Sequence, residues 1–99
     1  MKYMLTWSIP THSYDAALDA FLEGGAPMPE GLTALGRWHA PGSNRGWLLC
    51  QTDDLVALSQ HIGEWASKLN IEVSPVIEDR HAADAAARVR GLQRPGNQA

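Results

Sequence analysis

The segment GRWHAPGSNRGW, residues 36–47, gathers side chains that could do chemistry into one short turn region. Arg37 and His39 lie two positions apart, so in a strand they share one face. A neutral imidazole can act as a general base, and a guanidinium can hold an anionic or carbonyl group. Two interpretations stay open: ligand contact, or a structural role in which His39 donates to a backbone carbonyl and Arg37 pairs with a carboxylate at a subunit boundary.

Tryptophan is abundant, with four residues in 99. Trp65 has the helical spacing of a core residue, whereas three others lie near the turn region or the end of the first predicted strand and could wall a pocket for a flat organic molecule. Packing in the core or at an interface is the alternative. The candidate ligand-binding residues are Trp7, Arg37, Trp38, His39, Arg45 and Trp47, with His39 as the candidate catalytic base.

No metal site or bound cofactor is predicted. The four histidines include no pair at i, i+2 or i, i+4, although His12, His39 and Glu72 could approach one another at one end of the sheet. The glycines of the turn region form no phosphate loop, because no helix follows them. Cys50, in a predicted strand, is interpreted as a small hydrophobic residue rather than a nucleophile.

Composition limits the classes of partner. The net charge is −3 and the basic residues do not cluster, which disfavours nucleic acid. No apolar run approaches the roughly 20 residues of a membrane helix. The first residues lack the pattern of a secretory signal, and a single cysteine is typical of a reducing compartment, so we expect a cytoplasmic protein without a membrane or nucleic-acid partner.

Hydrophobic periodicity predicts the elements. Two-residue alternation predicts strands at 2–9, 32–39, 46–52 and 71–78. Helical spacing predicts a first helix capped by Thr11 and ended by Gly24. A second helix is expected after Thr52 or Asp53, with Leu55 on its apolar stripe and Asn70 at its end. Pro75 indicates that the fourth strand lies at a sheet edge. An alanine-rich helix is expected after Asp79.

The order predicts an α+β fold of the ferredoxin-like βαββαβ type, an antiparallel sheet with both helices on one face, plus a short C-terminal helix. Residues 1–90 form the single predicted domain, and 91–99 a disordered tail. The expected strand order is four, one, three, two. That order gathers six residues at one end of the sheet: Trp7, Ser8, His12, His39, Arg45 and Glu72.

Both faces of this sheet are predicted to be apolar. Leu5 and Trp7 alternate with Met4, and Leu48 alternates with Trp47 and Leu49 in the same way. Helices cover only one face, so the other would meet water. The economical cover is a second copy packed sheet against sheet, which predicts a homodimer.

The segments MKYMLTWSIP, LGRWHAPGSNRGWLL and EWASKLNIEVSPVIED resemble a family of small bacterial proteins of unknown function in the dimeric α/β-barrel, ferredoxin-like superfamily. The resemblance covers about residues 1–80. It implies the fold and dimerisation. Relatives in the superfamily include cofactor-free oxygenases, isomerases, haem enzymes and stress proteins, so it implies no particular activity.

Three hypotheses follow. The first is a small cytoplasmic dimer that binds a small organic ligand, without a bound cofactor, in a pocket near residues 39–47. The second is a structural or regulatory dimer without a ligand, in which the aromatic residues serve packing alone. The third is an enzyme, with His39 as the base of an oxygenase-like or isomerase-like reaction.

Overall fold

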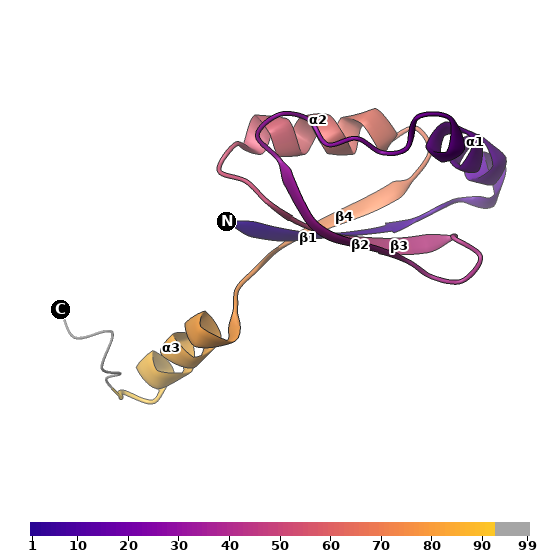
Figure 1. Cartoon of the computed structure of the whole chain (residues 1–99). Helices are drawn as coiled ribbons and strands as arrows, with labels where there is room; N and C mark the ends of the chain where they lie inside the picture. The colour runs from indigo at the N-terminus through magenta and orange to yellow at the C-terminus, as the bar shows by residue number, and fades with distance from the viewer. Residues whose placement is uncertain (93–99) are drawn as a thin grey trace.

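The computed structural model describes residues 1–92 of the chain. Its four strands form one antiparallel sheet in the order β2-β3-β1-β4. The strands are β1 (Lys2–Ser8), β2 (Thr33–His39), β3 (Arg45–Gln51) and β4 (Asn70–Val76). Helices α1 (Tyr14–Gly24) and α2 (Leu55–Trp65) lie on the same side of this sheet (Figure 1). The predicted ferredoxin-like fold and strand order are confirmed, and β4, which contains Pro75, is an edge strand.

Strand pairing assigns each side chain to a face of the sheet. Leu5 of β1 lies opposite Leu48 of β3, and Tyr3 lies opposite Cys50. Leu5, Leu48 and Cys50 point toward the helices and form the buried core together with Leu32, Ala57 and Leu58, and the partly buried Tyr3 packs against this core. Burying one large apolar side chain stabilises the fold by about 1.5–3 kcal/mol. The core therefore occupies the layer between the sheet and the helices, which is where a site on this face must lie.

The entry to α1 differs from the prediction. A short 3-10 helix, η1 (Thr11–Ser13), precedes α1, and the N-cap of α1 is Ser13 rather than Thr11. The Ser13 hydroxyl donates to the backbone carbonyl of Lys68 at 2.9 Å instead of capping its own helix. The bond ties the start of α1 to the segment that follows α2, so both helices are held at the same end of the sheet.

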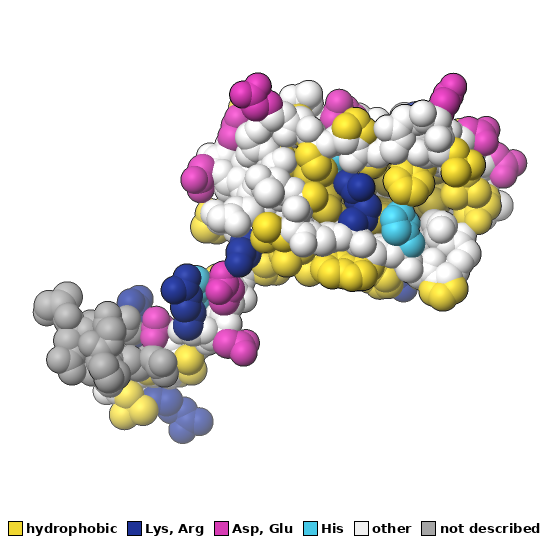
Figure 2. Space-filling model, viewed as in Figure 1, with side chains coloured by type: hydrophobic (Ala, Val, Ile, Leu, Met, Phe, Trp, Pro, Cys, Tyr) yellow, Lys and Arg dark blue, Asp and Glu magenta, His cyan; other side chains and the backbone are white. Residues whose placement is uncertain are grey.

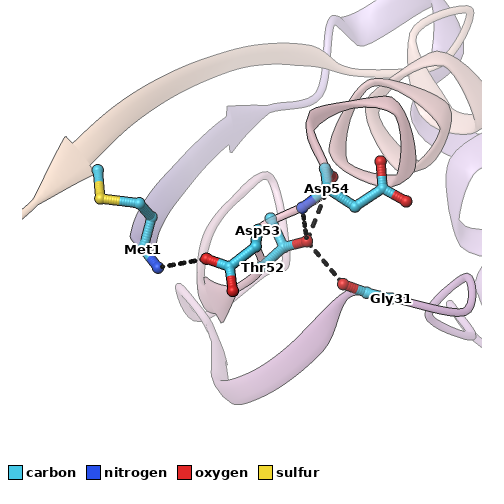
Figure 3. Close-up of polar contacts among 5 residues, drawn as sticks. All are labelled: Met1, Gly31, Thr52, Asp53 and Asp54. Carbon is cyan, nitrogen blue, oxygen red and sulfur yellow. Dashed lines mark hydrogen bonds and ion pairs between the residues drawn. The ribbon is translucent and has the colours of Figure 1, made fainter.

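The N-cap of α2 is Asp54, not Thr52 or Asp53. Asp54 Oδ1 accepts hydrogen bonds from the backbone N–H groups of Val56 and Ala57 at 3.0 and 3.2 Å. The Thr52 hydroxyl instead donates to the Gly31 carbonyl at 2.6 Å and accepts from the Asp54 N–H at 2.8 Å (Figure 3). Asp53 is 98% exposed and lies 3.4 Å from the terminal amino group (Figure 3). Both predicted caps are thus used for other contacts.

The apolar stripe of α2 is shorter than predicted. Leu55, at the first position of the helix, is 61% exposed, whereas Leu58 is buried. The helix ends at Trp65, and Asn70, predicted as its last residue, is the first residue of β4. The chain completes a turn after Trp65, where the Leu69 N–H donates to the Trp65 carbonyl at 2.9 Å.

The predicted C-terminal helix is confirmed as α3 (Asp79–Val89). It leaves the end of β4 and lies apart from α1 and α2 (Figure 1). Lys2 Nζ donates to Glu78 Oε1 at 2.5 Å, which connects the start of α3 to β1. In residues 1–92, no helix has both the length and the apolar character needed to cross a bilayer. Of the predicted tail 91–99, residues 93–99 lie outside the described residues.

Candidate functional site

A cavity of about 90 Å³ lies between the sheet and the two helices. The sheet contributes the apolar side chains Leu5, Trp7, Leu48 and Ile71, and the helices contribute Ala17, Leu18, Phe21 and Trp65. The polar side chains on its wall include Arg37, His39 and His61. Figure 2 shows the outer part of this region as a hollow in which a basic side chain and a histidine lie among apolar ones. Apolar walls with few polar groups are typical of small-molecule sites.

Gly46 allows Trp7 to lie against the sheet. Trp7 and Gly46 are directly opposite in the pairing of β1 with β3, and a Cβ atom at position 46 would collide with the Trp7 ring. The His39 ring packs edge-on against Trp7, with centroids 5.5 Å apart and an interplanar angle of 73°. Phe21 of α1 lies 5.4 Å from His39 on a tilted plane. These three aromatic side chains form one wall of the cavity, with His39 at its exposed side.

Arg37 lies on the same face of β2 as His39, as predicted, because Arg37 is opposite Leu48 and His39 is opposite Gly46. Its Nη2 donates to the Ala26 carbonyl at 3.0 Å, which holds the α1–β2 connection beside the cavity. The side chain is half-buried. Among the described residues, Arg37 forms no ion pair with a carboxylate of its own chain, and the alternative of a carboxylate partner at a subunit boundary stays a prediction.

His61 of α2 contributes a buried imidazole to the cavity wall and is only 6% exposed. Its Nδ1 has no hydrogen-bond partner within residues 1–92. The nearest acidic atom, Glu64 Oε1, lies 3.8 Å away, which is too long for a hydrogen bond. Burial lowers the pKa of His61, the positive charge of Arg37 lowers it further, and Glu64 acts in the opposite direction. The imidazole is therefore neutral at pH 7.

The β2–β3 loop closes one side of the site. The Tyr14 hydroxyl donates to the Gly42 carbonyl at 2.7 Å, which fastens α1 to the loop. Gly42 and Ser43 both have positive φ angles, 89° and 60°, which make the sharp turn between the strands. Ser43 then lies on the cavity wall. The predicted hairpin of residues 36–47 is confirmed, and its loop also borders the cavity.

The six candidate ligand-binding residues divide between the two faces of the sheet. Trp7, Arg37 and His39 line the cavity. The other three do not line it: Trp38 and Trp47 are paired across β2 and β3 on the face away from the helices, and the Arg45 guanidinium lies 5.9 Å from the centre of the Trp47 ring. Ligand contact by any of these residues, and base catalysis by His39, stay predictions.

The predicted cluster at the sheet end is divided in the same way. Trp7 and His39 are in contact on the helix side, whereas Ser8, Arg45 and Glu72 belong to the opposite face because strand side chains alternate. Across residues 1–92, no group of three or more His, Cys, Asp or Glu side chains is placed to share a metal ion.

A model for a domain of unknown function, DUF3303, matches residues 1–90. The chain belongs to this family. The predicted resemblance to a family of unknown function is thereby confirmed. No curated protein matches the sequence.

Two solved structures are similar to the chain. One is Rv0793 from Mycobacterium tuberculosis, at 15% identity and a TM-score of 0.47, with 79% of this chain and 97% of that chain covered. The other is MupZ from Pseudomonas fluorescens, at 16% identity and a TM-score of 0.37, with 99% of this chain and 97% of that chain covered.

The candidate site residues predicted from the sequence did not include His61. Position 61 follows Leu58 by three residues and precedes Trp65 by four, so it lies on the apolar stripe of α2. A histidine on that stripe is a signal that could have identified it. Cys50 agrees with its interpretation as a small hydrophobic residue: it is 0% exposed, and burial raises the pKa of its thiol, so the nucleophilic thiolate is disfavoured.

His61 predicts a loss of stability in mild acid. Its pKa is lowered in the folded chain, so below about pH 6.5 the unfolded chain binds a proton that the folded chain resists. The free energy of unfolding should therefore fall as the pH falls from 7 toward 5.5. The His61→Gln variant should lose this component, whereas His12→Gln, at an exposed position, should keep it. Urea unfolding at each pH measures the difference, and equal pH dependence in the two variants would contradict the assignment.

Proposed function

We propose that the chain binds a small organic molecule in the cavity between its sheet and its two helices. The observation that carries this proposal is the apolar cavity of about 90 Å³ with Arg37, His39 and His61 on its wall. An apolar cavity of about 150 Å³ can hold a benzene ring. The cavity here is smaller, so a molecule with one ring would fit only by extending into the outer hollow.

The aromatic wall supports a flat ligand. Trp7 packs edge-on against His39 and Phe21 lies on a tilted plane beside it, and aromatic groups pack favourably at the separations found here. Such a ligand would need no resident cofactor or metal for binding. Catalysis by His39 stays a prediction beside this binding function, as does the cytoplasmic location.

A cavity-filling substitution tests the binding function. Ala17 is buried on the cavity wall, whereas Ala16 is exposed on the same helix. We expect wild type and Ala16→Leu to bind at least one of two one-ring probes, benzyl alcohol or benzoate, and Ala17→Leu to bind it at least about tenfold more weakly, because the added methyl and methylene groups occupy the space. Saturation-transfer NMR titrations measure the affinity, and circular dichroism confirms that each variant is folded. Equal binding by the two variants, or no binding of either probe to wild type, would contradict the proposal.

We also propose that the partner of the chain is a second copy, packed against the sheet face that the helices leave open. Trp38 is 54% exposed on this face, and Met4, Trp47 and Leu49 share it. An apolar face of this kind disfavours the isolated protomer in water. A domain of this length also has a modest core of its own, so burial of this face in a dimer would add substantially to its stability.

A charge in the centre of the open face tests the dimer. Leu49 is paired with Met4 in the sheet, whereas Leu22 is 84% exposed on α1. We expect sedimentation velocity at micromolar concentration to show a dimer for wild type and for Leu22→Glu, and a monomer for Leu49→Glu, because a carboxylate buried between two sheets lacks a partner. A monomeric wild type would contradict the proposal.

A further inference from the structure

The formal charge on the cavity wall is positive. The described residues that line it include Arg37 and two histidines, of which His61 is neutral at pH 7, and no aspartate or glutamate, although the whole chain has a net charge of −3. The remaining wall is predominantly apolar, and electrostatic interactions are stronger beside apolar surfaces than in water. The interior therefore favours a ligand with a negative charge.

Arg37 has unused donors at this place. A guanidinium carries five N–H groups, and the protein acceptors bonded to Arg37 are the Ala26 carbonyl at 3.0 Å and the Met28 sulfur at 3.5 Å, both through Nη2. No carboxylate in residues 1–92 forms an ion pair with it. A half-buried cation is costly to leave without an anion, so an anionic ligand would relieve this cost.

His61 supplies a second unpaired group. It is more than nine-tenths buried on the cavity wall, and its Nδ1 lacks a hydrogen bond. Glu64, 3.8 Å from Nδ1, is half-exposed and can be solvated by water, so it does not substitute for a buried acceptor. Arg37 and His61 both line this cavity, and the positive charge of Arg37 lowers the pKa of His61.

We propose that Arg37 and His61 bind the carboxylate of a small monocarboxylic acid whose apolar body, about one ring in size, lies against the aromatic wall. This inference deepens the proposed binding function and depends on it. A guanidinium fork and one imidazole N–H match the two oxygens of a carboxylate. A phosphate, with more oxygens and more charge, would leave acceptors unsatisfied in an otherwise apolar cavity.

Benzoate and its neutral counterpart benzyl alcohol test the carboxylate assignment on the full chain. We expect wild type to bind benzoate at least about tenfold more tightly than benzyl alcohol, since hydrogen bonds to charged groups contribute more than neutral ones. Arg37→Gln should lose about tenfold to a hundredfold in benzoate affinity and little in benzyl alcohol affinity. Arg37→Lys, which keeps the charge and loses the fork, should lie between them. The control is Arg45→Gln, on the opposite face of the sheet, which should bind benzoate as wild type does.

His61 has a separate readout. Two-dimensional NMR of the histidine ring nitrogens should show the Nδ1 resonance of His61 move on benzoate addition, with no change for His12. His61→Phe, which keeps an aromatic ring and loses both ring nitrogens, should weaken benzoate binding by about tenfold. Glu64→Gln should leave benzoate affinity unchanged or raise it, because the substitution removes a negative charge near His61 that would repel the carboxylate.

Two outcomes separate this inference from the proposed function. Binding of benzyl alcohol and benzoate with equal affinity, both lost in Ala17→Leu, would overturn the carboxylate assignment and leave the cavity as a binding site. Absence of binding by both probes would overturn both. Equal losses in Arg37→Gln and Arg45→Gln, or a tenfold loss in Glu64→Gln, would also overturn the assignment of the carboxylate to Arg37 and His61.

Discussion

Pairing of β2 with β3 places Arg37 opposite Leu48 and His39 opposite Gly46, on the face of the sheet that the helices cover. Polar side chains at these positions lie next to the apolar layer under the helices, and His39 reaches water only at the exposed side of the cavity. They must lie beside the core, where each polar atom needs a partner or a solvated path. This register decides which side chains of β2 line the cavity. A shift of one residue would place Trp38 instead of Arg37 on the face that the helices cover.

The incomplete filling of the same layer produces the cavity. α1 presents the small Ala17 to the sheet, and Gly46 has no side chain to meet it from β3, so Trp7 occupies part of the space instead. Interiors of proteins are usually packed as densely as organic crystals, and a gap lined by large side chains loses contacts on every side. A ligand of complementary shape would restore those contacts. The two faces of the sheet therefore serve different proposed partners: a small molecule on the helix side and a second protomer on the other.

The fold was predictable because each strand and helix carries a clear period. The alternation in residues 2–9 and the spacing from Leu58 to Trp65 both arise because one face of the element is buried. The period of apolar residues in the sequence therefore predicts the type of element. The N-cap of α2 was harder to predict from the sequence, because Thr52, Asp53 and Asp54 are all good N-cap residues. Asp54 is the cap because the Thr52 hydroxyl donates instead to the carbonyl of Gly31, which is distant in the sequence. Leu55 is exposed because no element of the described chain covers the first turn of α2 on that side.

The site was predictable only in part. Arg37, His39 and Trp7 could be inferred from their spacing and from the strand order. Trp38, Arg45 and Trp47 are near the same loop in sequence, but alternation sends them to the opposite face, and proximity along the chain does not reveal this. His61 was missed because a polar residue in a helix is expected on its exposed side. Its position on the apolar stripe of α2 nevertheless indicates burial.

The central claim is that the layer between the sheet and the helices contains an unfilled apolar space. Diffraction from crystals pressurised with xenon tests it directly, since xenon occupies dry apolar cavities of this kind. The account predicts a xenon atom between Leu48 of β3 and Trp65 of α2, with the surrounding side chains unmoved. A xenon-free layer in which Phe21 or His39 has turned inward to fill the space would contradict it.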